Sequence, residues 1–132
     1  MREYLFEKPE AWKLARAFRR SIYQVSKTFP PSEKFGLTSQ VERAASSITA
    51  NLAEGAGRLG FKDKIRFVNM AYASCLEFLD HIIGAHDLGY IDEDKYVELR
   101  LQLDQVVSKI ERFTAYLNKK ESESTSTSSV RN

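Results

Sequence analysis

Polar residues recur at helical spacing between Gly36 and Arg58. On a helix they fall within an arc of about 80°, and we call them the polar stripe: Gln40, Arg43, Ser47, Asn51, Glu54 and Arg58. Glu77, in the next segment, is grouped with them as a candidate partner for an arginine. Ser and Asn are weaker helix formers than the Lys and Glu typical of a solvated face, and Gln is neutral in comparison. The pattern therefore predicts a specific polar contact surface.

Catalysis by this surface has little support. Asn51, Glu54 and Arg58 have the residue types of an acid–base site, but Glu54 and Arg58 also have the spacing of an ordinary ion pair on one helix. Ser47 and Ser74 have no base at a spacing that would activate a hydroxyl. We therefore expect a protein that is not an enzyme and takes no small-molecule substrate.

Metal and cofactor chemistry are also not expected. His81 and His86 are five residues apart, which places them on different faces of a helix. Glu77 is followed three residues later by Asp80, whereas di-iron bundles carry Glu-x-x-His. The single Cys75 lies in an apolar run and is typical of a buried small side chain.

A second candidate surface is basic. The segment between Pro9 and Phe29 carries Lys13, Arg16, Arg20 and Lys27 nearly opposite its apolar residues, with Trp12, Arg19 and Tyr23 along one flank. Residues 1–31 hold seven Lys or Arg against three acidic residues, a net charge of +4, whereas the whole chain has +2. Such a face can bind phosphates and stack bases. It is more typical of a solvated helix whose Trp and Tyr pack at a seam, because amphipathic helices normally place charge outward.

Four amphipathic segments position these residues. Their predicted ranges are 9–29, about 39–55, 61–88 and 92–117. Ser39 and Glu42 have the spacing of a capping box, and Asp92 suits the N-cap of the last helix. Short connections between such helices predict an all-α fold, an antiparallel four-helix bundle. We expect a bundle domain over residues 1–120 and a disordered Ser/Thr-rich tail over residues 121–132.

The third segment is apolar around more than half of its circumference. One seam contains Ile65, Val68, Tyr72, Cys75, Leu79 and Ile82, and the adjoining seam contains Phe67, Ala71, Ser74 and Phe78. A helix this apolar needs cover on two sides, so we expect a homo-oligomer. No run reaches membrane-spanning length and no signal peptide is recognisable, so no membrane contact and a cytoplasmic location are expected.

The second segment also carries a family pattern. In order it supplies Leu37, Thr38, Gln40, Arg43, Ala44, Ser47, Ile48, Asn51, Ala53, Glu54, Gly55 and Arg58. Further matches are Trp12, Phe29-Pro30, Glu33, Arg66-Phe67, Ala71, Ser74, Glu77 and Leu88-Gly89-Tyr90. Over residues 4–118 the chain resembles the bacterial four-helix-bundle proteins encoded in 23S rRNA intervening sequences. Tyr4, Phe6 and Ala73 depart conservatively from the pattern.

The resemblance implies a left-handed up-down-up-down bundle and a homopentamer around a central opening. It suggests association with ribosomal RNA or another nucleic acid and implies no settled activity. The leading hypothesis is a non-catalytic homo-oligomer that associates with RNA or DNA through its basic faces. The alternatives are a protein-interaction scaffold and an accessory subunit of a nucleic-acid enzyme such as a reverse transcriptase.

Overall fold

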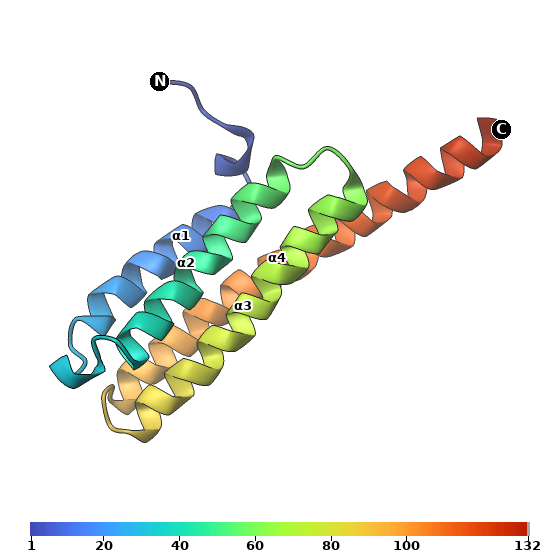
Figure 1. The fold of residues 1–132 in the computed structure, drawn as a ribbon. Coiled ribbons are helices and arrows are strands. Elements are labelled where there is room, and N and C mark those ends of the chain that lie inside the picture. The colour runs from blue at the N-terminus through green and yellow to red at the C-terminus, as the bar shows by residue number, and fades with distance from the viewer. Residues whose placement is uncertain (132) are drawn as a thin grey trace.

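The computed structural model describes the backbone of residues 1–131 and the side chains of residues 1–125. Over the described residues the chain is all-α, with four long helices and no strand. These are α1 (Glu10–Ser26), α2 (Leu37–Ala56), α3 (Phe61–Asp87) and α4 (Glu93–Arg131), with single turns η1 (Leu5–Glu7) and η2 (Pro31–Glu33). The α1–α2 and α3–α4 connections lie at one end of the bundle, and the α2–α3 connection lies at the other (Figure 1).

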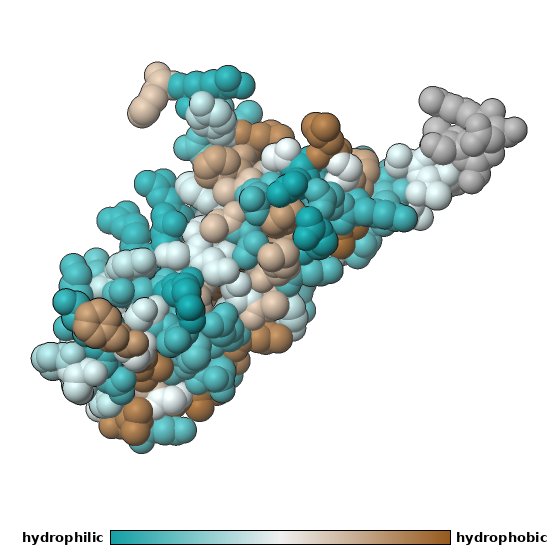
Figure 2. Space-filling model, in the orientation of Figure 1, coloured by the Kyte–Doolittle hydropathy of each residue, from teal (hydrophilic) through white to brown (hydrophobic). Residues whose placement is uncertain are grey.

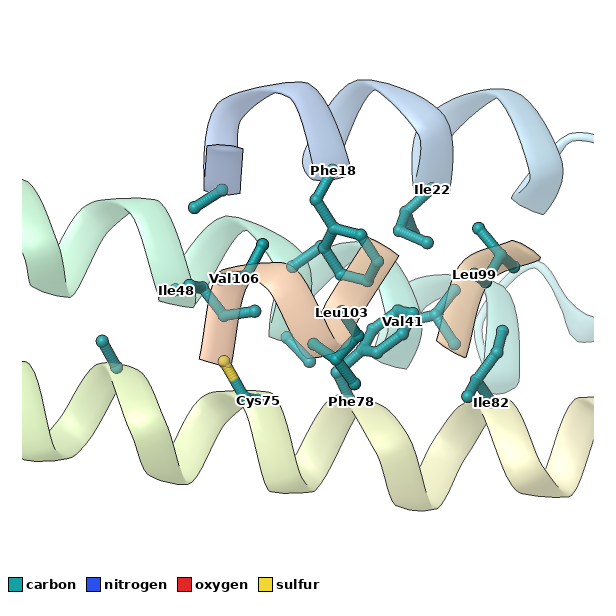
Figure 3. Packing of buried hydrophobic residues seen from close by; sticks show 14 of the residues in the cluster. Phe18, Ile22, Val41, Ile48, Cys75, Phe78, Ile82, Leu99, Leu103 and Val106 are labelled. Atoms are coloured by element: carbon teal, nitrogen blue, oxygen red, sulfur yellow. The ribbon is translucent and has the colours of Figure 1, made fainter. Parts of the chain in front are cut away.

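The core forms where the apolar stripes of the four helices meet (Figure 3). Phe18 of α1 packs edge-to-face against Phe78 of α3, with ring centroids 4.8 Å apart. Ile48 of α2 and Val106 of α4 are fully buried in the same cluster. The last segment, predicted over 92–117, carries apolar residues at an unbroken three–four spacing that predicts one buried face, and the structure confirms it: Leu99, Leu103, Val106, Ile110 and Leu117 are all buried.

The start of α4 agrees with the sequence, because an Asp92 carboxylate oxygen accepts the Lys95 backbone N–H at 2.8 Å. The predicted capping box of the second helix is wrong. Helix α2 begins at Leu37, so Ser39 already lies inside it. Glu33, in the preceding turn, accepts the Leu37 N–H at 3.2 Å. Glu42 instead accepts a 2.6 Å hydrogen bond from the buried Ser26 of α1.

Helix α3 ends in a Schellman motif, which the α3–α4 connection requires. Gly89 has a φ of +76°, a conformation that side chains with a Cβ disfavour. The Gly89 N–H donates to the His86 carbonyl and the Tyr90 N–H donates to the Ala85 carbonyl. The Tyr90 hydroxyl then reaches Glu33 at 2.8 Å, which ties the two connections at this end of the bundle together.

The two apolar seams of α3 are covered largely within one chain. Helix α3 packs against both α2 and α4, and these neighbours bury most of the residues in both seams. Besides Met70, which lies on another face, three large apolar side chains stay exposed along one face of the helix: Tyr72, Leu76 and Ile83. We call them the α3 strip, and Figure 2 shows hydrophobic patches along the edge that α3 forms. The surface left for a partner is therefore narrower than the sequence predicted, because two neighbouring helices shield a wide arc.

Helix α4 extends past the expected end of the bundle domain. It continues through Glu121 to Arg131 and projects beyond the other three helices (Figure 1). The side chains of residues 122–125 are exposed. The prediction of disorder over residues 121–132 falls partly outside the described residues and stays a prediction.

Candidate nucleic-acid interface

The basic residues of α1 lie on its outer face. Lys13, Arg16 and Arg20 of the helix and Lys27 at its C-cap are exposed, and they lie opposite the stripe that α1 buries. We call these four residues the basic face. Figure 2 shows hydrophilic side chains along the edge that α1 forms. Glu10 is the only acidic residue of this helix, and its carboxylate lies 3.9 Å from the Lys13 ammonium with both side chains exposed. Such a pair leaves most of the positive charge available to a partner, because exposed ion pairs are weak.

Two residues on the flank of this face bind α2. The Arg19 guanidinium donates to the Thr49 hydroxyl at 2.9 Å. The Tyr23 hydroxyl lies 3.1 Å from the Ser46 hydroxyl, with either oxygen able to donate. Arg19 was predicted with the nucleic-acid-binding residues, and the structure gives it a contact between helices in addition.

Much of the polar stripe lies in the groove between α2 and α3. Ser47 and Ser74 are joined across the two helices by a 2.8 Å hydrogen bond. The Asn51 amide donates to the Ser47 backbone carbonyl at 2.9 Å and to its hydroxyl at 3.0 Å. The Ser74 hydroxyl also has the Met70 carbonyl as an acceptor at 3.0 Å. The choice of Ser and Asn over Lys and Glu therefore has a structural reason, a short polar bridge between closely packed helices.

The two ends of the stripe are arranged differently. At the N-terminal end, the exposed Arg43 donates to the Gln40 side-chain oxygen of its own helix. At the other end, the Arg58 guanidinium lies over the Phe67 ring at 4.4 Å from its centroid. Arg58 also lies 3.6 Å from carboxylate oxygens of both Glu54 and Asp63. Charge at this end is therefore balanced within the chain.

Arg66 of α3 completes this cluster from the other side. Its guanidinium is 4.6 Å from the Phe67 centroid and donates to Asp63 at 2.9 and 3.0 Å. Two guanidinium groups thus share one aromatic ring and one carboxylate. The family pattern in the sequence contained Arg58, Arg66 and Phe67, but only the fold places them together around Asp63.

Glu77 does not pair with an arginine among the described side chains. Its Oε1 atom instead lies 3.5 Å from Nε2 of His81 on the same helix. His86 lies apart from His81 and faces α4, where its Nε2 is 2.8 Å from the Glu93 carboxylate and its ring stacks on Tyr96 at 4.1 Å. No group of three His, Cys, Asp or Glu side chains within residues 1–125 is placed to hold a metal ion.

Burial also sets the acidity of the single thiol, Cys75. Cys75 is fully buried in the core, and desolvation of the thiolate raises its pKa to about 12.

Across the part of the chain that the structure describes, no helix combines the length and hydropathy needed to cross a membrane.

The fold also forms a cleft that sequence reasoning did not identify. The chain before α1 folds beside its first turns and leaves an open cleft of about 400 Å³. Trp12, Lys13 and Arg16 line one side, and Arg2, Glu3 and Glu7 line the other. The aromatic and basic residues of the first helix were recognised, but their meeting with Arg2 depends on how the N-terminal segment turns back.

Comparison with known proteins agrees with this fold. A solved structure from Bacteroides thetaiotaomicron, described as a protein of unknown function from the S23 ribosomal protein family, superposes with a TM-score of 0.74 at 19% identity. The alignment covers 80% of this chain and 95% of that one. No curated protein matches the sequence. The model of the 23S rRNA-intervening sequence protein family matches residues 7–112, and the chain belongs to this family.

Proposed function

We propose that this protein is a non-catalytic homo-oligomer that associates with structured RNA through the basic face of α1. The proposal includes the antiparallel, left-handed order of helices and the pentameric ring that the family resemblance implies. The single observation that carries the RNA-binding part is the basic face itself. It places four exposed cations on one side of α1, with Glu10 the only acidic residue of that helix.

The dimensions of this face suit a phosphate backbone. Lys13 and Lys27 are 14 residues apart, which corresponds to about 21 Å along a helix axis. One strand of a B-form DNA duplex advances about 3.4 Å per phosphate, so on that scale the basic face spans about six phosphates, and the more compact A-form of RNA gives it no fewer. Long exposed Lys and Arg side chains can adjust to such a strand without loss of packing in the core.

Oligomerisation would place several copies of the basic face on one assembly. The α3 strip leaves apolar area for a second copy, with Leu76 50% exposed. Several basic faces on one assembly engage one RNA with a higher overall affinity than a single face does. Both parts of the proposal are therefore tested together, assembly by mass in solution and binding by retention of RNA.

The RNA experiment measures retention of a structured RNA on filters across a salt series. We expect affinity to fall linearly on a double-logarithmic plot, because phosphate contacts release counterions. The variant Arg16→Gln/Arg20→Gln should lower the steepness of that line by about 1.4 to 1.8, since each phosphate contact contributes about 0.7 to 0.9. As a matched control, Arg112→Gln/Lys119→Gln removes the same charge from exposed positions on α4. Absence of salt-sensitive retention, or equal loss in the control, would refute the RNA-binding proposal.

A protein-interaction scaffold remains the competing proposal, whether free-standing or as an accessory subunit of a nucleic-acid enzyme such as a reverse transcriptase. Two large apolar side chains favour it, since Phe35 is 89% exposed and Leu59 is 101% exposed in the connections before and after α2. Exposed apolar residues of this size at bundle ends are typical of contacts with other proteins. A wild-type protein that assembles normally and retains no RNA would favour the scaffold.

A further inference from the structure

The cleft beside the first turns of α1 combines an aromatic face with cations. Trp12 is half-buried, with Phe6 packed edge-on against its indole at 5.1 Å between ring centroids. The Arg16 guanidinium lies over the indole at 5.7 Å from the ring centroid. Packing by Phe6 therefore holds the Trp12 ring in place at the side of the open cleft.

A flat, cationic stack of this kind is a platform for a nucleobase. Bases of single-stranded RNA stack on aromatic rings and on the planes of arginine guanidinium groups. A volume of about 400 Å³ falls within the range of small-ligand sites. The paired Arg16 and Trp12 offer the two kinds of plane that such a base uses.

The charges around the cleft suit the phosphates on either side of that base. Arg2 and Lys13 line the cleft together with Arg16, so three cations surround it. The carboxylates of Glu3 and Glu7 also line the cleft. One oxygen of Glu7 already accepts a hydrogen bond from the Tyr4 backbone N–H at 2.6 Å. The Glu3 carboxylate has no hydrogen-bond or ion-pair partner among the described side chains and can accept an N–H of a base edge.

We propose that this cleft binds one unstacked nucleotide of single-stranded RNA, with its base against Arg16 and Trp12 and its phosphates near Arg2 and Lys13. The inference rests on the proposed RNA-binding function and deepens it by naming the part of an RNA that the protein holds. A regular duplex keeps its bases stacked inside the helix and cannot supply this ligand. Loops, bulges and ends of a structured RNA can.

The chain carries its own reporter for this site, because Trp12 is the only tryptophan. The experiment follows tryptophan fluorescence of the full-length protein, excited at the red edge of indole absorption, during titration with a short oligoadenylate. A free tryptophan derivative titrated in parallel corrects for absorption by the RNA. The comparison ligands are an abasic oligoribonucleotide of equal length and a duplex of equal phosphate number.

We expect oligoadenylate to change the fluorescence saturably and to bind about tenfold more tightly than the abasic chain. Arg16→Gln should weaken the oligoadenylate affinity about fivefold or more. The matched variant Arg112→Gln removes the same charge from an exposed position on α4, outside both the cleft and the basic face, and should weaken it less than about twofold.

Three results would overturn the inference: no saturable change with oligoadenylate, equal binding of the abasic chain, or equal losses for the two variants. Any of them combined with salt-sensitive RNA retention on filters would leave the proposed function standing without this site. A different result would refute the proposed function instead. If the protein retained no structured RNA on filters but still bound oligoadenylate, then only the cleft, and not the basic face, would bind RNA.

Discussion

At Gly55 the backbones of α2 and α3 approach so closely that a single methyl group would collide. A Cβ added there would lie 2.9 Å from the Phe67 Cβ and 3.4 Å from the Lys64 carbonyl oxygen. The obstacle is the Phe67 Cβ, which is bonded directly to the α3 backbone and cannot rotate away as the end of a side chain can. The same approach lets the short side chains of Ser47 and Ser74 reach each other across the groove.

Gly55→Ala should therefore destabilise the fold by about 1–3 kcal/mol, because overpacking outweighs the gain in helix propensity. Gly84→Ala is the matched control, since Gly84 lies inside α3 with nothing within 4 Å of an added Cβ. That variant should stabilise the protein by about 0.5–1 kcal/mol. Urea unfolding followed by circular dichroism measures both, and a stabilised Gly55→Ala would contradict the close approach.

The raised pKa of Cys75 predicts an unreactive thiol. With a pKa of about 12 instead of 9.0, the native protein should react with a thiol reagent at pH 8 far more slowly than the urea-unfolded chain does. The folded pKa is raised, so this group's contribution to stability is complete below pH 9 and is lost as pH rises towards 12. A native reaction rate close to the unfolded rate would show that the core around Cys75 opens readily.

At the scale of helices, the beginning of α2 depends on a residue outside it. Glu33 has one oxygen on the Leu37 N–H and the other on the Tyr90 hydroxyl. The hydrogen bond to Glu33 raises the pKa of Tyr90 above its ordinary value, because the carboxylate stabilises the protonated phenol. One side chain thus caps a helix and holds the next connection in place.

Glu33→Ala should lower the free energy of unfolding by about 1–2 kcal/mol, as loss of a cap does. Ser39→Ala should change it by less than about 0.5 kcal/mol, because Ser39 is exposed inside α2 and caps nothing. Thermal and urea unfolding of the two variants measure which residue caps α2, Glu33 as in the structure or Ser39 as predicted from the sequence. A larger loss for Ser39→Ala would favour the capping box.

At the scale of the whole molecule, the homo-oligomer that we propose rests on the α3 strip as its interface. Leu76→Glu places a charge on this strip and should shift the protein towards a folded monomer, with helix content unchanged. Leu101→Glu is the matched control on α4, where the leucine is 60% exposed. Analytical ultracentrifugation measures both variants against the wild type. A monomeric wild type would refute the homo-oligomer, and dissociation by Leu101→Glu alone would move the interface to α4.

The sequence was sufficient to predict the four helices and the N-cap of the last one. The 3–4 spacing from Leu99 to Leu117 predicted the buried face of α4, and Asp92 was placed at its start. These features depend on residues three or four positions apart, because a helix is closed by hydrogen bonds over that distance. The same reasoning separated the basic face of α1 from its core residues.

Only the tertiary structure decided which polar residues meet. Arg19 reaches Thr49 and Glu33 reaches Tyr90, pairs 30 and 57 residues apart in the chain. The cleft at Trp12 likewise depends on the N-terminal segment folding back to bring Arg2 alongside. Such contacts form only when particular helices become neighbours and pack closely. The packing is set by burial of apolar surface over the whole chain, which no single segment of the sequence determines.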